Sequence, residues 1–170
     1  MRMKVFVLTI VALMSFGAAQ AALEKGDNEV EFTFNYTDTD EVGSTLQFDL
    51  LYGWFLTENH EIGLLANYFD ISSDVADELD VDGGSFGGFY RYNFGGDVWS
   101  PFLGARVSTA FGDLGDAYDL GYGVEAGARY LVGDHAAIVG RLFWEKLQAA
   151  EDFIEDSDTL GVAIGLSIHY

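Results

Sequence analysis

Nine charged residues occupy equivalent positions in stretches of alternating apolar and polar residues. All of them fall on the polar side of the alternation: Arg91, Arg106, Arg129, Arg141, Glu31, Asp49, Glu61, Glu125 and Glu145. Four positive and five negative charges nearly balance here, although the whole chain has a formal charge of −20. An unpaired buried charge is strongly destabilising, so near balance is typical of charges enclosed together. The pattern predicts an ion-pair network that plugs an interior, and conduction of protons or ions through that interior is the alternative.

The alternation that positions these charges recurs eight times along the chain. It covers residues 30–36, 46–54, 61–68, 86–93, 103–108, 120–130, 138–145 and 160–170. Because successive side chains of a strand point to opposite faces, each stretch predicts an amphipathic β-strand. Glycines on the polar side leave room for the long charged side chains.

The connections between these strands are of two kinds. Short ones with turn-forming residues (55–58, 94–100 and 132–135) alternate with mostly longer polar ones (37–44, 69–84, 109–118 and 147–158). This asymmetry is typical of outer-membrane barrels. We therefore predict an all-β fold, an eight-stranded antiparallel up-and-down transmembrane β-barrel. An even strand number places both termini at the short-turn end, which would be the periplasmic side.

Aromatic residues near the strand ends form two bands. One band lies at the short-turn end and contains Trp54, Tyr92, Phe94, Tyr130 and Tyr170. The other contains Tyr36, Tyr68 and Trp144. Two such bands are expected where a barrel crosses both membrane interfaces. Aromatic packing in the core of a soluble sandwich is the alternative.

The composition excludes several other classes of protein. With 28 acidic against 8 basic residues, the chain lacks the basic stripe of a nucleic-acid binder. The absence of cysteine rules out disulfides, thiolate metal sites and cysteine nucleophiles. An apolar fraction of 49% argues against a disordered acidic chain. Beyond the N-terminal segment, no stretch is long and apolar enough for a helical membrane span.

The first 21 residues have the features of a secretory signal peptide. Arg2 and Lys4 precede an apolar run over residues 5–14, and Ala19-Gln20-Ala21 provides small residues for cleavage. A short buried helix or strand of the folded protein is the alternative. We predict that residues 1–21 are removed, that residues 22–170 form the barrel, and that the protein leaves the cytoplasm.

Several of these strands resemble a known family. Residues 53–64 (GWFLTENHEIGL) resemble a strand–turn–strand unit of small outer-membrane β-barrel domain proteins, and residues 101–105 and 126–131 resemble later strands. The final strand resembles the C-terminal signal that the outer-membrane assembly machinery reads, carried by Val162, Ile164, Leu166, Ile168 and Tyr170. The chain is similar in size to OmpX-like proteins and OmpA-type transmembrane domains.

We therefore predict a non-enzymatic, monomeric protein of the Gram-negative outer membrane, with periplasmic termini and no cofactor, although the resemblance itself implies the fold more than the activity. Its partners would be the assembly machinery, outer-membrane lipid and lipopolysaccharide, and its role would be structural or surface interaction. A narrow ion or small-solute channel is one alternative. A lipid-modifying enzyme is another, but the chain lacks the His-x-Ser of lipid A deacylases, and Ser167 and His169 fall at the wrong end of the barrel. A secreted soluble adhesin or lectin is a fourth hypothesis.

The long connections are strongly acidic. Together with Asp119, just after the third of them, they hold 17 of the 28 acidic residues, and they contain no lysine or arginine. A solvated, repulsive surface is the simplest interpretation, and weak divalent-cation binding that bridges to anionic lipopolysaccharide is the alternative. The candidate residues for such binding are Asp77, Glu78, Asp80 and Asp82. We predict no dedicated metal site, because Phe89 stands where a calcium loop beginning at Glu78 needs a bidentate glutamate.

Overall fold

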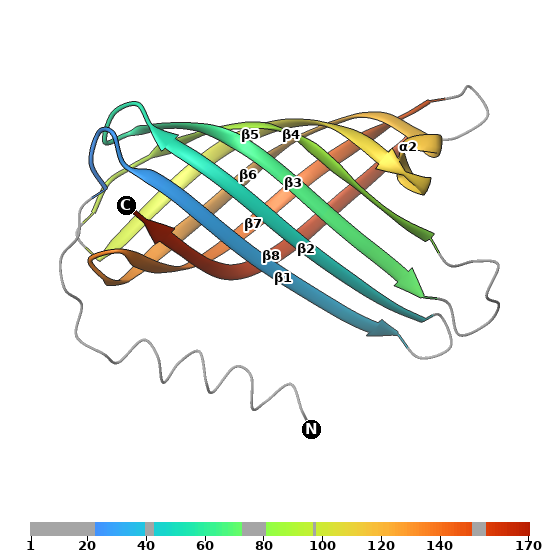
Figure 1. Cartoon of the computed structure of the whole chain (residues 1–170), viewed down its shortest axis with the longest axis horizontal. Helices are drawn as coiled ribbons and strands as arrows, with labels where there is room; N and C mark the ends of the chain where they lie inside the picture. The colour runs from blue at the N-terminus through green and yellow to red at the C-terminus, as the bar shows by residue number, and fades with distance from the viewer. Residues whose placement is uncertain (1–22, 40–42, 73–80, 97, 151–155) are drawn as a thin grey trace.

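The computed structural model describes residues 23–39, 43–72, 81–96, 98–150 and 156–170. Eight antiparallel strands, each paired with the next along the chain, form a closed barrel (Figure 1). The strands are β1 (Asn28–Thr39), β2 (Gly43–Phe55), β3 (His60–Ser72), β4 (Val81–Asn93), β5 (Trp99–Gly112), β6 (Tyr118–Gly133), β7 (Ala136–Ala149) and β8 (Ser157–His169). A short helix, α2 (Asp113–Ala117), connects β5 and β6. The predicted fold class is confirmed.

The two ends of the barrel differ. The terminal end carries the start of β1, the C-terminal Tyr170 and the turns 56–59, 94–98 and 134–135. The loop end carries α2 and the other connections. Among the turns, the one between β4 and β5 depends on glycine, because Gly95 and Gly96 have φ angles of 74° and 139° that other residues rarely adopt.

The strands extend farther toward the loop end than the sequence pattern predicted. They contain 12 to 16 residues, whereas a strand needs only about 9–11 residues to cross a membrane. Five acidic residues assigned to connections therefore lie in strands: Asp38, Asp70, Asp82, Asp119 and Asp158. Alternation of apolar and polar residues is expected only where one face of a strand meets an apolar surrounding. The polar ends of the strands lack this alternation, so the sequence pattern did not predict them.

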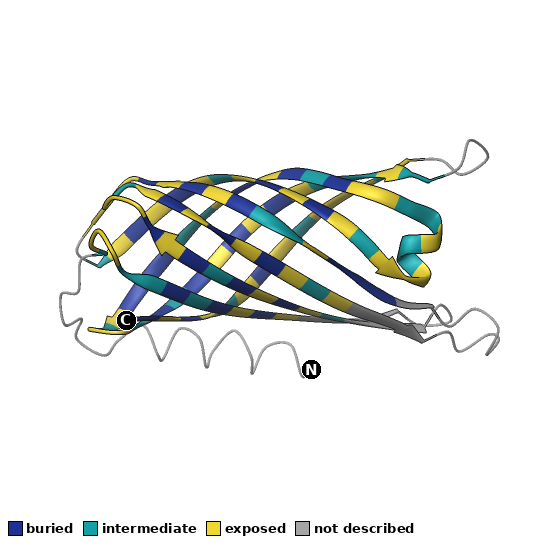
Figure 2. Ribbon diagram, turned by 45° about the horizontal axis from the view of Figure 1, so that its top comes forward, coloured by how far each residue is buried: buried dark blue, intermediate teal, exposed yellow. Residues whose placement is uncertain are grey.

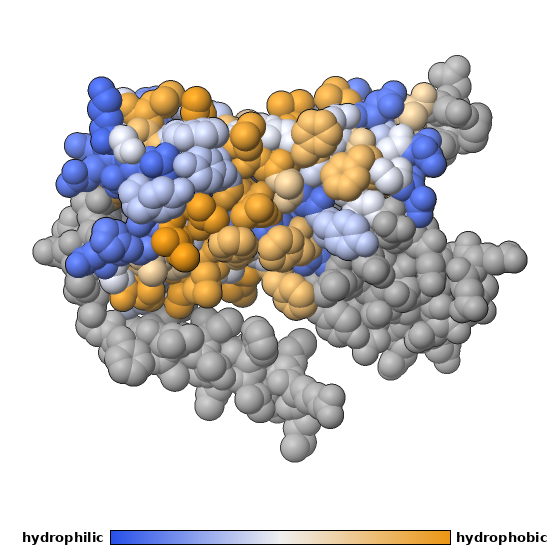
Figure 3. All heavy atoms as spheres, viewed as in Figure 1, coloured by the Kyte–Doolittle hydropathy of each residue, from blue (hydrophilic) through white to orange (hydrophobic). Residues whose placement is uncertain are grey.

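The barrel is apolar outside and polar inside. Leu64, Phe86 and Leu166 are 59%, 57% and 60% exposed on the outer face. Buried residues include 16 polar or charged against 11 hydrophobic ones within the described part of the chain, the reverse of a soluble protein's interior. Buried and exposed residues alternate along the strands in Figure 2, and Figure 3 shows a broad apolar zone between hydrophilic ends. None of the helices in the described ranges is long and apolar enough to cross a membrane.

Strands β1 and β8 close the barrel. At the terminal end, the backbone N–H of Asn28 donates to the carbonyl of Tyr170 (2.9 Å), and the N–H of Tyr170 donates back (3.1 Å). The paired register then runs over six residues, Glu29–Phe34 with Ile164–His169. By contrast, the β1–β2 register covers all twelve residues of β1. The closing seam is therefore paired only in its terminal half.

Candidate functional site

The first tier of the lumen, next to the terminal end, is organised around Arg129 of β6. Its Nε and Nη2 donate to the two carboxylate oxygens of Glu29 at 2.7 and 2.5 Å. Nη2 also donates to Glu61 Oε2 at 2.7 Å, and Nη1 donates to Asn93 Oδ1 at 2.5 Å. Arg129, Glu29 and Glu61 are all at most 1% exposed. One arginine thus joins strands β1, β3, β4 and β6 across the lumen.

The middle tier contains two arginines that share Glu31. Arg91 donates from Nη1 to Glu31 Oε2 (2.7 Å) and from Nε to Glu125 Oε1 (2.5 Å). Arg141 donates from Nη1 to the other oxygen of Glu31 and from Nη2 to Asp49 Oδ2 (2.7 Å). These contacts, with Glu31 shared between two arginines, are charge-assisted hydrogen bonds, which are stronger than neutral ones. They extend the network to β1, β2, β4, β6 and β7.

A third, simpler ion pair lies nearer the loop end. Arg106 Nη2 is 3.2 Å from Glu145 Oε2, and the side chains are 7% and 13% exposed. Neither Nε nor Nη2 of Arg106 has a hydrogen-bond partner, whereas Arg91 and Arg141 each lack one at a single nitrogen. Arg106 is therefore the least completely paired arginine of the lumen.

Phenylalanine rings separate and cover the guanidinium groups. The Phe102 ring lies between two of them, 4.4 Å from Arg91 and 4.8 Å from Arg129. Phe143 lies 4.5 Å from Arg106. Such cation–π contacts are worth about 2 kcal/mol or more when desolvated. The rings also exclude water from the ion pairs and so strengthen them.

Glycines supply the space that the network occupies. A Cβ atom at Gly53 would collide with the Glu61 carboxylate, and one at Gly104 would approach Arg91 Cγ and Glu125 Cγ to 3.0 Å. The lumen is therefore packed to the point where a single methyl group does not fit. Close packing of this kind agrees with the general size of an eight-stranded barrel interior.

The structure brings together all nine charged residues that the sequence singled out. Eight are buried and Glu145 is half-buried. Sequence reasoning missed Glu29, which binds Arg129 and raises the negative charges in the lumen to six against four arginines. The signal was present, because Glu29 precedes Glu31 by two residues, on the same side of β1. Phe89 and Phe143 fall on the polar side of the alternation, but sequence reasoning did not predict that phenylalanines cover the arginines, as Phe55, Phe89, Phe102 and Phe143 do.

The remaining predicted residues lie away from the network or outside the described residues. The five residues of the C-terminal pattern are all exposed on the outer face of β8 and at its end, from 47% for Ile164 to 60% for Tyr170. Of the candidate cation-binding residues, Asp77, Glu78 and Asp80 lie outside the described ranges, and Asp82 is the second residue of β4. Within the described ranges, no group of three or more His, Asp or Glu side chains could hold a metal ion.

Ser167 and His169 do not form a catalytic triad. Their Oγ and Nε2 atoms are 3.0 Å apart. The Glu29 carboxylate is 3.9 Å from the same Nε2, and the other nitrogen, Nδ1, has no hydrogen-bond partner. A triad needs its carboxylate on Nδ1. Ser167 is also only 1% exposed, so a substrate could not reach its hydroxyl.

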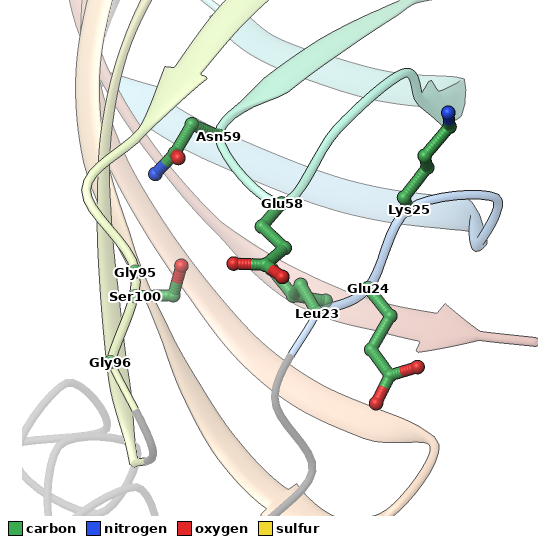
Figure 4. Close-up of a pocket in the computed structure, with 8 residues that line it drawn as sticks. All are labelled: Leu23, Glu24, Lys25, Glu58, Asn59, Gly95, Gly96 and Ser100. Carbon is green, nitrogen blue, oxygen red and sulfur yellow. The ribbon is translucent and has the colours of Figure 1, made fainter.

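A pocket of about 550 Å³ opens at the terminal end, below the first tier. Its lining includes Leu23, Glu24, Lys25, Glu58 and Asn59, and Figure 4 shows these residues with Gly95, Gly96 and Ser100. Ser100 also lines the pocket, and its buried hydroxyl has no hydrogen-bond partner. The pocket holds none of the nine network residues, so the candidate site is the lumen network above it.

Comparison with known proteins gives matches at the level of structure alone. No protein-family model and no curated protein matches the sequence. The outer membrane protein OprG of Pseudomonas aeruginosa matches with a TM-score of 0.57 and 15% identity, over 89% of this chain and 99% of OprG. The N-terminal β-barrel domain of OprF from the same organism matches with a TM-score of 0.53 and 13% identity, over 86% and 98%. The fold is that of the small eight-stranded outer-membrane β-barrels.

This likeness concerns the fold and not an activity. A transmembrane β-barrel designed de novo matches equally well, with a TM-score of 0.56 and 14% identity over 86% of this chain and 98% of the design. Small outer-membrane barrels thus share an architecture that can be built on very different sequences. Function has to be argued from the residues of this chain.

Proposed function

We propose that the protein is an integral outer-membrane barrel whose lumen is plugged by its ion-pair network, with a structural or surface-interaction role and no enzymatic activity. The observation that carries this proposal is the inverted polarity of the barrel. Exposed apolar side chains cover its outer face, while ten charged residues gather inside, Glu29 included. In water, that outer face would be a very large exposed hydrophobic patch, whereas in a bilayer it faces hydrocarbon.

Aromatic residues on the outer face support insertion in a membrane. Trp54, Trp99 and Tyr170 are 38%, 50% and 60% exposed near the terminal end. Tyr68 and Trp144 are 42% and 37% exposed nearer the loop end. Amphipathic rings in two such bands suit the two membrane interfaces. In the terminal half every strand is paired with both neighbours, which fits as well, because open sheet edges do not occur in lipid.

The orientation follows from the connections. Short turns of outer-membrane barrels face the periplasm, so the terminal end would be periplasmic and the loop end extracellular. At the loop end, Asp156 forms an ion pair of 3.0 Å with Lys146. Asp113, Asp116 and Asp158 add negative charge there. Divalent cations that bridge these carboxylates to lipopolysaccharide phosphates are part of the proposal, since direct contact would be repulsive.

The network favours a closed lumen over a channel. A conducting path would have to separate Arg129 from Glu29 and Glu61, or Arg141 from Glu31. Breaking a buried ion pair typically costs about 3–5 kcal/mol, because it leaves an uncompensated charge. Because several such pairs lie along the lumen, the costs of breaking them add to one another.

Cell fractionation followed by gel electrophoresis of unheated and boiled samples tests the location and the closed barrel. We expect recovery in the outer membrane and a mobility that changes on boiling. Recovery as a soluble periplasmic protein with unchanged mobility would contradict the proposal.

Two further measurements separate the alternative functions. In planar bilayers, we expect the purified protein to give no discrete conductance steps, and regular steps would favour the channel. By mass spectrometry, we expect the acylation of lipid A from overproducing cells to be unchanged. Altered acylation would favour a lipid-modifying enzyme.

A further inference from the structure

The barrel wall has an unpaired stretch at the seam between β1 and β8. The β1–β8 register ends at Phe34 and Ile164, yet β1 continues to Thr39 and β8 begins at Ser157. Both strands stay paired with their other neighbours: β1 pairs with β2 as far as Thr39, and β8 pairs with β7 as far as Ser157. In Figure 1, β1 and β8 lie together near the C-terminus and separate toward the loop end. Two strand edges therefore face each other without a ladder between them.

An open edge at this place calls for a polar occupant. Backbone N–H and C=O groups that lack partners are expensive in hydrocarbon, at several kcal/mol for each group. In a membrane-embedded barrel they need water or a polar group of another molecule. The opening thus suits a ligand that has both a polar and an apolar part.

An apolar groove on the outer face reaches this edge. Its volume is about 370 Å³ and its outward side chains come from strands β5 to β8: Leu103, Val124, Ala126, Leu142, Trp144 and Leu160. Ala126 is paired in register with Leu103 on one side and Leu142 on the other, so its short side chain leaves a hollow between them. Leu160 lies on the part of β8 that is paired with β7 but not with β1, and it is 79% exposed. The groove has the shape and polarity for an alkyl chain.

Arg106, the least completely paired arginine, lies on the lumen side of the same edge. The Phe143 ring covers Gly161 so closely that a Cβ atom there would collide with it. On that ring, 4.5 Å from its centre, lies the Arg106 guanidinium. Two of its nitrogens, Nε and Nη2, have no hydrogen-bond partner, and the side chain is 93% buried. Arg106 can therefore accept one more anionic partner beside Glu145.

We propose that the unpaired part of the β1–β8 seam, the outer groove and Arg106 form a binding site for a single-chain amphiphile with a carboxylate head. The alkyl chain occupies the groove and passes the edge at Leu160. The carboxylate accepts hydrogen bonds from Arg106, in competition with Glu145. This inference rests on the membrane location proposed above, because it requires entry from the lipid side.

Two engineered cysteine pairs test whether the seam is open. The chain contains no cysteine, so any disulfide must come from the introduced residues. The control pair F34C/I164C lies at the last paired position. The test pair Y36C/V162C lies two residues farther along both strands, where the same register would put it. Cross-linking needs Cα atoms within about 7 Å.

We expect the control pair to oxidise in membrane vesicles and the test pair to stay reduced. Equal oxidation of both pairs would show a fully paired seam and overturn the inference. If the barrel proposal itself were wrong, the boiling-dependent mobility of the wild-type protein would be lost, so the two failures are distinguishable.

A photoactivatable hexadecanoic acid in phospholipid vesicles tests the ligand. We expect it to label the groove near Leu160, and R106Q to reduce the labelling about tenfold or more, as loss of a charged hydrogen bond predicts. E145Q removes the competing carboxylate, so it should increase labelling. The matching fatty alcohol should label wild type and R106Q alike. Acid labelling that is the same in wild type, R106Q and E145Q would overturn the inference, even with all three variants folded.

Discussion

The two halves of the lumen differ in how fully their charges are paired. Toward the terminal end, Arg129 binds two carboxylates and an amide at 2.5–2.7 Å, all of them buried. Toward the loop end, Arg106 has one carboxylate at 3.2 Å, and that partner is half-buried. The seam shows the same gradient, because β1 and β8 pair only in the terminal half. The comparison indicates that ion pairing and strand pairing are both more complete in the terminal half, so this half contributes most to holding the barrel closed.

The largest expected effect is from Arg129→Leu in the terminal half. This substitution leaves the carboxylates of Glu29 and Glu61, which are 0–1% exposed, without their cation. We expect a loss of about 3–5 kcal/mol in the free energy of unfolding, or failure to assemble. Urea unfolding in vesicles and the boiling-dependent gel shift measure both. Arg91→Leu and Arg141→Leu should act in the same direction.

A matched substitution on the outer face provides the control for these variants. Val124→Leu lies on the same strand as Arg129 but is 55% exposed. It should leave the unfolding midpoint unchanged. Unchanged heat resistance in all three arginine variants would contradict a lumen held by ion pairs.

The next effect concerns the packing of the terminal half. Gly53→Ala introduces a Cβ atom that collides with the Glu61 carboxylate. We expect destabilisation of about 1–3 kcal/mol, the usual range for overpacking. Gly140→Ala is the matched control, because a Cβ atom at Gly140 has no neighbour within 4 Å. Equal unfolding midpoints for the two variants would mean that the lumen has spare room.

A smaller effect is expected from Arg106→Leu in the loop-end half. Glu145 is left without its cation, but at 13% exposure it has access to water. We therefore expect a loss of about 2 kcal/mol, mainly from the lost contact of Arg106 with the Phe143 ring and below the loss for Arg129→Leu. The same unfolding assay gives the ratio of the two effects. Comparable losses for both variants would remove the distinction between the halves.

The smallest effect is at the loop-end surface. A hydrogen bond from the Lys146 ammonium lowers the pKa of Asp156 from its ordinary value. A lowered folded-state pKa means that the pair stabilises the fold above the ordinary pKa of aspartate, and that this contribution is lost as pH falls through the folded pKa. NMR titration of Asp156 should show the lowered pKa, and Lys146→Met should raise it toward the ordinary value, with the hydrogen bond from the Ala149 backbone N–H still lowering it. An unshifted Asp156 in the wild-type protein would contradict the ion pair.

Much of this molecule could be predicted from alternation alone. The parity of Arg91, Arg129 and Arg141 along their strands fixed which side chains face the lumen, and nearly balanced charge indicated that they are enclosed. Glu29 was missed because it precedes the apolar run that starts at Val30 and follows the polar Asp27-Asn28. The contacts between phenylalanines and arginines were missed because alternation predicts which side chains face inward but not which of them meet, and Phe102, the partner of two arginines, precedes the predicted run over residues 103–108.

Other features have no signal in a single sequence. Polar strand ends such as those of β1 and β4 resemble connections, since nothing apolar marks them. The partial pairing of β1 with β8 depends on how eight strands close on one another, and the residues of either strand do not encode it locally. The hydrogen-bond partners within the network likewise depend on which side chains meet across the lumen.

Fluorescence quenching by brominated phospholipids tests the inverted polarity most directly. The chain has three tryptophans, and all lie on the outer face: Trp54 is 38%, Trp99 50% and Trp144 37% exposed. If this face contacts lipid, brominated lipids will strongly quench the emission of the barrel in vesicles, while water-soluble iodide will quench it weakly. Strong iodide quenching without quenching by the brominated lipids would contradict the account.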